Sequence, residues 1–103
     1  TPDQAVVLPI SDKYNDYAQQ VRERLEALDV RTLVDDRSEK IGRKIRDNEI
    51  KHIPFLLVVG EKEAADGTVA VREHGSEGKQ EVMTIDAFDK SVNEEAKAQL
   101  GDY

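Results

Sequence analysis

The sequence predicts an α/β domain with three layers, in which helices cover both faces of a mixed five-stranded sheet. Short, continuous apolar runs that suit buried strands alternate with longer segments whose apolar residues recur at helical spacing. Farther along the chain, two strand-like segments are separated by about eight residues, which is too few for a parallel crossover. We therefore expect the order β-α-β-α-β-β-β-α, with three helices and one strand antiparallel to the others.

The first strand and the first helix lie near the start of the chain. Ala5–Leu8 is a short apolar run that suits a strand buried on both faces, and Pro9 ends it. Ser11 or Asp12 can cap the next helix, because each side chain has an oxygen that accepts a backbone N–H. Six apolar residues then follow helical spacing and predict one packed stripe. They are Tyr14, Tyr17, Ala18, Val21, Leu25 and Leu28.

A second strand at Arg31–Val34 and a turn at Asp35–Ser38 lead into a second helix, which we expect from Glu39 to Asn48. Its inward residues are predicted to be Ile41 and Ile45, and its largely outward residues Arg43, Lys44 and Arg46. Gly42 is unusual in such a segment, since glycine costs about 1 kcal/mol relative to alanine within a helix. It predicts either a close approach of another group or the start of the helix.

The third strand is Phe55–Val59, whose five apolar residues predict a central place in the sheet. A polar turn, Gly60–Glu63, and a further turn, Ala64–Gly67, follow it. Thr68–Glu73 then alternates, with its two valines on one face. The third and fourth strands therefore form an antiparallel hairpin.

The last strand and the last helix complete the predicted domain. After a turn at Gly75–Gly78, Gln80–Met83 is expected to be an edge strand. Thr84 can cap the C-terminal helix. The residues expected to face inward from this helix are Ile85, Phe88, Val92 and Ala96.

Composition excludes several classes of function. The chain has no cysteine, so it has neither disulfides nor a thiolate metal site, and it suits a reducing cytosol. No apolar run approaches the roughly 20 residues of a membrane span. No phosphate-binding loop or nucleophile elbow occurs. His52 and His74 stand 22 residues apart without metal-ligand spacing, so surface or packing roles are expected for both.

Charge is distributed unevenly along the chain. The whole chain carries −7, which argues against strong nucleic-acid binding without sequence preference. Arg37–His52, however, holds six Lys and Arg against three Asp and Glu, a local charge of +3. Such a basic segment is either a solvated surface with helical charge pairs such as Arg43–Asp47 or a face that meets an anion. The adjacent Asp35 and Asp36 are interpreted as a turn and helix-capping pair rather than a proton-sharing pair.

The chain also contains the string DDRSEKIGRKIRDNEIKHIPFLLVVGEKE and, soon after it, GTVAVREHG. From about Ala5 to about Phe88 it resembles the C-terminal anticodon-binding domain of class II aminoacyl-tRNA synthetases. Within that family it is most similar to the threonyl branch, because of the EKIG-x-KIR form and the GEKE turn. The length of 103 residues predicts one domain, residues 1–103. The chain does not begin with Met, so we expect either a processed product or an excised fragment. The resemblance implies the latter, the C-terminal fragment of a larger synthetase.

The resemblance implies that this domain recognises the anticodon loop of tRNA(Thr) and catalyses nothing itself. In the family, the Glu of the turn and the Arg of the VxVR strand contact anticodon bases, and Glu63 and Arg72 match them here. We expect these two side chains to stand side by side. Without the resemblance, Glu63 is a solvated turn carboxylate and Arg72 a surface ion-pair partner. The full set of expected RNA contacts is Glu63, Arg72, Lys62, Ser38, Arg37 and Lys40.

The chain departs from the family pattern at three places. Ser38 stands where the family has Asn, Glu73 and His74 replace an Arg-rich stretch, and Gln80–Met83 replaces Leu-Gly-x-Met. The resemblance implies that the parent is a cytoplasmic, homodimeric threonine–tRNA ligase, with ATP, Mg²⁺ and a catalytic zinc in a core outside this chain. The remaining alternatives are a prolyl, glycyl or histidyl relative, and a protein-interaction module of the same fold.

Overall fold

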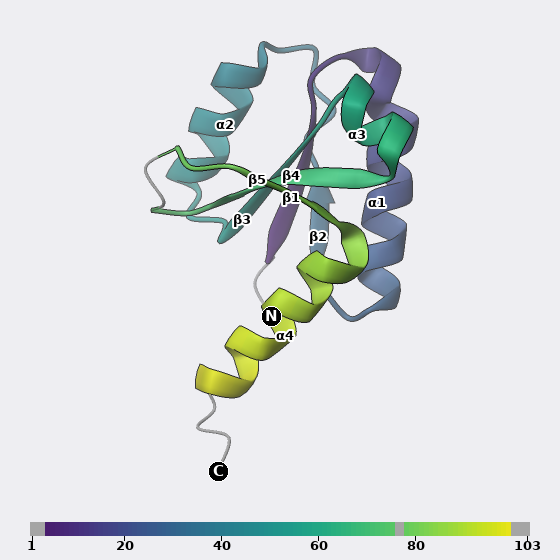
Figure 1. Cartoon of the computed structure of the whole chain (residues 1–103). Helices are drawn as coiled ribbons and strands as arrows, with labels where there is room; N and C mark the ends of the chain where they lie inside the picture. The colour runs from purple at the N-terminus through teal and green to yellow at the C-terminus, as the bar shows by residue number, and fades with distance from the viewer. Residues whose placement is uncertain (1–3, 76–77, 100–103) are drawn as a thin grey trace.

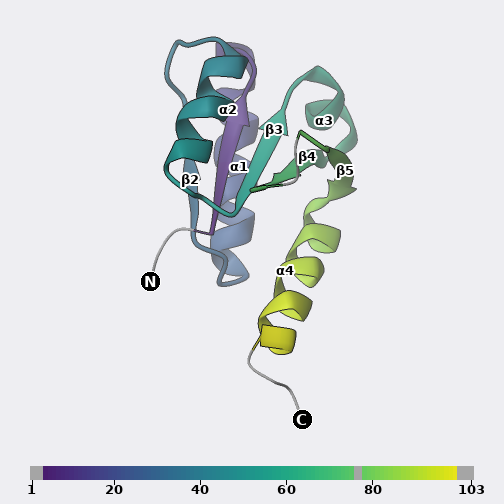
Figure 2. The same cartoon turned by 90° about the vertical axis from the view of Figure 1, so that its left-hand side faces the viewer.

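The computed structural model describes residues 4–75 and 78–99, which form a five-stranded sheet with helices on both faces (Figures 1 and 2). The strand order across the sheet is β2-β1-β3-β4-β5, so β3 is central, as its apolar composition predicts. The strands are β1 (Ala5–Pro9), β2 (Thr32–Val34), β3 (Phe55–Val59), β4 (Thr68–Glu73) and β5 (Glu81–Thr84).

The directions of the strands confirm the predicted mixed sheet. β1 pairs in parallel with both β2 and β3, whereas β4 pairs antiparallel with β3 on one side and β5 on the other. β4 alone therefore runs against the other four strands. The two valines of β4 face one core cluster and Ala70 faces the other, which confirms the alternation expected for this strand.

The three expected helices are present and divide between the two faces of the sheet. α1 (Asn15–Ala27) and α4 (Ile85–Gln99) pack on one face, and α2 (Ile41–Ile50) packs on the other (Figure 1). We call these the α1/α4 face and the α2 face. On the α1/α4 face, the rings of Phe55 and Phe88 pack edge to face, with their centroids 5.2 Å apart. Burial of apolar side chains in these two clusters is the main driving force for the fold.

α2 differs from its prediction at both ends and at one side chain. It begins at Ile41 and ends at Ile50, two residues later than expected at each end. Ile41 and Ile45 pack against the sheet as predicted, but Lys44 was expected to face outward and is buried. Gly42 lies in the first turn of α2, and a Cβ built on it would meet nothing within 4 Å. Of the two explanations for this glycine, a helix start is therefore the correct one.

A short helix, α3 (Glu61–Asp66), occupies the segment predicted as two turns. Ala64 and Ala65 favour helix, and two glutamates in the first turn complement the positive end of the helix dipole. Gly67 ends the helix in the left-handed region, with φ 72°, which glycine adopts without steric cost. The prediction failed because the polar residues were interpreted as turn residues and the first-turn preference of glutamate was overlooked.

The remaining boundaries follow the sequence closely. The Ser11 side chain accepts a hydrogen bond from the Lys13 N–H, and so caps a single 3-10 turn, Asp12–Tyr14, that precedes α1. Leu28 was predicted to join the packed stripe of α1 but lies beyond the helix and is exposed. Thr84 caps α4 as expected, since its Oγ1 accepts from the Ala87 N–H at 3.1 Å. Ile85, Phe88 and Val92 are buried, whereas Ala96 lies outside the residues whose side chains are described.

Candidate nucleic-acid interface

The carboxyl ends of β1, β2 and β3 meet at one edge of the sheet, because these three strands run in parallel. In sheets of this kind, loops that leave the carboxyl ends are a common place for binding sites. The turn before α2, the N-terminus of α2 and the start of α3 all lie here. We call this region the carboxyl edge. Five of the six predicted RNA contacts are on it: Arg37, Ser38, Lys40, Lys62 and Glu63.

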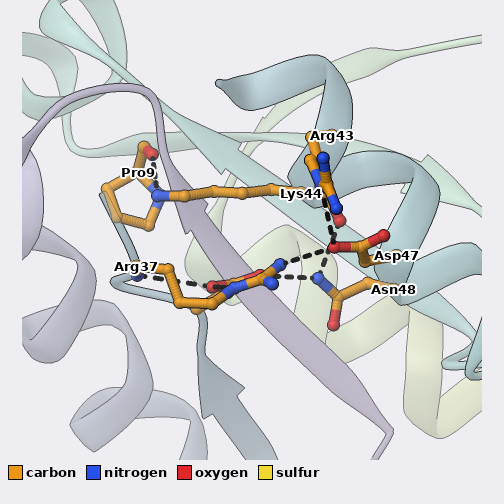
Figure 3. Close-up of polar contacts among 7 residues, drawn as sticks. Pro9, Arg37, Arg43, Lys44, Asp47 and Asn48 are labelled. Carbon is orange, nitrogen blue, oxygen red and sulfur yellow. Dashed lines mark hydrogen bonds and ion pairs between the residues drawn. The ribbon is translucent and has the colours of Figure 1, made fainter. Parts of the chain in front are cut away.

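Arg37 is held in place by two carboxylates. Its Nε and one Nη donate to Asp35 at 2.8 and 2.9 Å, and the same Nη donates to Asp47 on α2 at 3.1 Å (Figure 3). The pKa of Arg37 is raised above its usual value, chiefly by the hydrogen bond to Asp35 and then by that to Asp47. The guanidinium therefore serves first to fasten the turn to α2, although its side chain is half exposed.

Two further residues of α2 complete this network, and the sequence predicted a structural role of this kind for neither. Lys44 is 3% exposed, and its ammonium donates to the Pro9 carbonyl oxygen at 3.0 Å, which fixes α2 to the end of β1 (Figure 3). The buried Asn48 amide donates to Asp35 at 2.9 Å and to the Lys44 carbonyl oxygen at 2.8 Å. Lys44 and Asn48 are four residues apart, which makes them neighbours on a helix, and this spacing was the signal available in the sequence.

Asp35 is the electrostatic centre of the network. Burial raises the pKa of its carboxyl, but side-chain hydrogen bonds from Arg37 and Asn48 lower it by more, to about 2. Its Oδ1 also accepts the Arg37 N–H, which confirms the predicted turn role. The predicted helix-capping role is wrong, because the N-cap of α2 is Lys40 and no side chain caps that helix.

The exposed cations next to this network remain available to an external anion. Within the described part of the chain, Lys40 and Arg46 form no ion pair, and Arg43 lies 3.9 Å from Asp47. They surround a surface hollow of about 930 Å³ beside the first two turns of α2. Ser38 and Lys40 are exposed on the preceding turn. The basic segment is thus partly a structural network and partly an open charged surface.

Glu63 is half-buried and caps α3. Its Oε1 accepts the Gly60 backbone N–H at 2.8 Å, which satisfies one of the donors that a helix N-terminus leaves unpaired. A carboxylate has a second oxygen, so capping leaves acceptor capacity on this side chain. Burial raises the pKa of the Tyr17 phenol, the Arg24 charge lowers it, and the Glu63 charge makes a smaller contribution that raises it. Lys62, one residue earlier, is exposed.

Arg72 lies at the other end of the hairpin. It pairs in register with Leu56, the second residue of β3, and shares its face of the sheet, the α2 face. It is half-buried, and its Nη1 donates to the Gly78 carbonyl oxygen and to the Gln80 amide oxygen, both at 3.4 Å. These two bonds are long, so they hold the guanidinium weakly.

The expectation that Glu63 and Arg72 stand side by side is therefore wrong. Glu63 follows the last residue of β3, whereas Arg72 pairs near its first. Because β4 runs antiparallel to β3, the chain returns along most of β3 before it reaches Arg72. About 10 Å of strand separates Leu56 from the end of β3. These two side chains belong to separate parts of the surface.

Neither a metal site nor a membrane span occurs among the described residues. No group of three or more His, Asp or Glu side chains is placed to hold a metal ion in residues 4–75 and 78–99. No helix in those ranges combines the length and the hydropathy that crossing a bilayer requires. The exposed large apolar residues come from five different segments of the chain. They are Ile10, Leu28, Leu33, Ile50 and Val82.

Residues 4–95 match the family model described as anticodon binding domain. Threonine–tRNA ligase of Phocaeicola vulgatus is 55% identical over 103 residues, which is all of this chain and 16% of that protein. Threonine–tRNA ligase of Bacteroides thetaiotaomicron is 52% identical with the same coverage. The chain thus spans about a sixth of the length of these relatives.

Similar structures have the same fold. The RNA binding domain of threonyl-tRNA synthetase from Cryptosporidium parvum Iowa II matches with a TM-score of 0.86 and 32% identity, over 91% of this chain and 24% of that chain. Prolyl-tRNA synthetase of Cryptosporidium parvum matches with a TM-score of 0.79, over 90% of this chain and 20% of that one. Its identity of 21% supports the fold alone.

Proposed function

Because this chain belongs to the anticodon-binding domain family, we propose that it recognises the anticodon loop of tRNA(Thr) as the C-terminal domain of a threonine–tRNA ligase. The observation that carries this proposal is identity of 55% and 52% to two threonine–tRNA ligases over the whole length of the chain. The exposed cations and the free hydrogen-bonding groups described above are consistent with an RNA partner.

Recognition of a single-stranded loop requires groups that pair with base edges and groups that hold phosphates. In this proposal Arg72 donates to acceptor atoms of one base, and the second oxygen of Glu63 accepts from a donor edge of another. Ser38, Lys62 and Lys40 contact the loop from the carboxyl edge. Arg37 acts mainly by holding the turn that presents Ser38 and Lys40, since its own donors face two carboxylates.

In the same proposal, the catalytic site of the parent ligase lies outside this chain. ATP, Mg²⁺ and a catalytic zinc would bind to the rest of the ligase, which would act as a cytoplasmic homodimer. This domain would then supply selection of the correct tRNA and no reacting group. Recognition at the anticodon selects tRNA through interactions remote from the reacting centre.

Two alternatives make different predictions. A prolyl, glycyl or histidyl parent would prefer another anticodon. The similarity to a prolyl-tRNA synthetase, at 21% identity, supports the shared fold and not this alternative. A protein-interaction module would need a contiguous apolar patch. No observation on the described residues favours that function.

The decisive measurement compares two anticodon stem-loops, one with a threonine anticodon and one with its middle guanine replaced by adenine. We expect the threonine loop to bind about tenfold more tightly, the size of one lost bidentate base contact. Arg72→Ala should remove this preference. Binding is measured by fluorescence anisotropy, with the 103-residue chain and with the full-length ligase.

Arg24→Ala is the matched control, because Arg24 is an exposed arginine on α1 that pairs with Asp86 of α4, away from the α2 face. It should leave the preference between the two loops unchanged. Equal binding of both loops by the full-length ligase would reject base recognition. Tighter binding of a proline, glycine or histidine anticodon loop would support the corresponding alternative parent.

A further inference from the structure

His52 and His74, the only two histidines of the chain, lie against each other. Their ring centroids are 5.2 Å apart and their planes meet at 66°, an edge-to-face contact between rings from the end of α2 and the end of β4. This contact could not be predicted from the sequence, because 22 residues separate the two positions. Both side chains are exposed to solvent.

The backbone around the pair is fixed. The His52 N–H donates to the Glu49 carbonyl oxygen at 3.0 Å, and the His74 N–H donates to the Pro54 carbonyl oxygen at 2.7 Å. His52 has φ 60°, a left-handed conformation that glycine adopts more readily than histidine. Histidine is one of the residues other than glycine that adopt this conformation more often than most.

The pair adjoins Arg72. His74 and Arg72 line the same small cleft, together with Glu49, Glu73 and Gly78. Lys51 precedes His52 in the chain and is exposed. We call His52, His74 and Arg72 the imidazole patch. It is a second surface, at the opposite end of β3 from Glu63.

Charges of both signs surround the small cleft. Glu49 and Glu73 line it together with Arg72 and His74. Histidine is the side chain that ordinarily changes charge between about pH 5 and pH 8.

We propose that the imidazole patch is a proton-dependent contact for a phosphate of the bound RNA, next to the base contact of Arg72. This inference rests on the proposed function and extends it to a contact that none of the comparisons describes. When protonated, the two imidazoles and the guanidinium present several N–H donors at one place, which suits a phosphate oxygen. When neutral, the patch retains only Arg72 as a cation.

The test measures binding of the threonine anticodon stem-loop at about pH 6 and about pH 8, the two sides of the ordinary histidine titration. EDTA is present throughout to exclude a metal ion bridging the imidazoles. We expect binding to be about fivefold tighter at the lower pH, the size of one exposed charge contact. The dependence of log Kd on log salt should also steepen by about one phosphate contact.

The variants are His52→Asn, which tolerates the left-handed backbone, His74→Gln, and the double variant. Each single change should reduce the difference between the two pH values, and the double variant should lose it while binding like the unmodified chain at about pH 8. The control is Lys90→Gln, an exposed cation on α4, which should keep the full difference. An amide NMR spectrum of each variant verifies the fold.

The outcomes separate this inference from the proposed function. A pH difference that persists in the double variant, or equal binding by the unmodified chain at both pH values, overturns the imidazole contact. In both cases the preference for the threonine anticodon at about pH 8 still supports the proposed function. Absence of that preference at either pH contradicts the proposed function and with it this inference.

Discussion

At the scale of single residues, Asp35 makes stability depend on pH. Its pKa is about 2 in the folded chain against a usual 3.8, so folding favours the ionised carboxylate. The contribution is fully present above about pH 4 and is lost as the pH falls toward 2. A difference of this size corresponds to at most about 2 kcal/mol of the free energy of unfolding. Urea unfolding of the unmodified chain and of Asp35→Asn at several pH values should show that the variant loses most of this acid dependence.

Asp36→Asn is the control for this prediction. Asp36 is the adjacent residue and is exposed, so its replacement should leave the acid dependence unchanged. If Asp35→Asn kept the full dependence between about pH 4 and pH 2, the hydrogen bonds from Arg37 and Asn48 would not stabilise the carboxylate as described.

The contacts of Arg37 and Lys44 could not be predicted from the sequence. The four-residue spacing of Arg43 and Asp47 predicted their proximity, which the structure confirms at 3.9 Å. The pairing of Arg37 with the same Asp47 depends on the turn that brings residue 37 back over α2, and helical spacing says nothing about it. The burial of Lys44 likewise depends on the place where β1 ends.

At the scale of elements, α3 depends on its final glycine. Gly67 has φ 72° and its N–H donates to the Glu63 carbonyl oxygen at 2.8 Å. A Cβ would meet no neighbour there, so the cost of Gly67→Ala is the left-handed backbone alone. We expect the free energy of unfolding to fall by about 1 kcal/mol, measured by urea denaturation.

Gly42→Ala is the matched control, with the opposite sign. Gly42 also has no neighbour within 4 Å of a built Cβ, but its φ is not in the left-handed region. Alanine should therefore favour the first turn of α2 and raise the free energy of unfolding by up to about 1 kcal/mol. A loss of stability in both variants would mean that crowding, and not backbone conformation, decides the result.

The elements that the sequence predicted well are those with a strong apolar pattern. β1, β3, β4, α1, α2 and α4 all have apolar stripes or runs, because their burial supplies the energy of the fold. α3 has no buried residue, so hydrophobic periodicity gave no signal for it. Only its capping glutamate, its two alanines and its flanking glycines indicate a helix, and these signals are local.

At the scale of the whole molecule, the candidate RNA surface has two parts. The carboxyl edge carries Ser38, Lys40 and Glu63, and the imidazole patch with Arg72 lies at the other end of the hairpin. The family resemblance identified residues for both parts, but the prediction that Glu63 and Arg72 stand side by side was wrong. Their separation follows from the register of β3 and β4, which only the structure supplies.

This separation makes a prediction about energetic coupling. Mutations in residues more than about 7–10 Å apart with no shared partner usually have additive effects, to within about 0.5 kcal/mol, whereas residues in contact are coupled more strongly. Glu63 bonds to Gly60, and Arg72 to Gly78 and Gln80, so the two side chains share no partner among the described residues. A double-mutant cycle with Glu63→Gln, Arg72→Ala and the double variant should therefore give additive losses in binding of the threonine anticodon stem-loop. Coupling above about 1 kcal/mol would mean that both side chains contact the same nucleotide, as a side-by-side pair would, and that the bound domain differs from the free one.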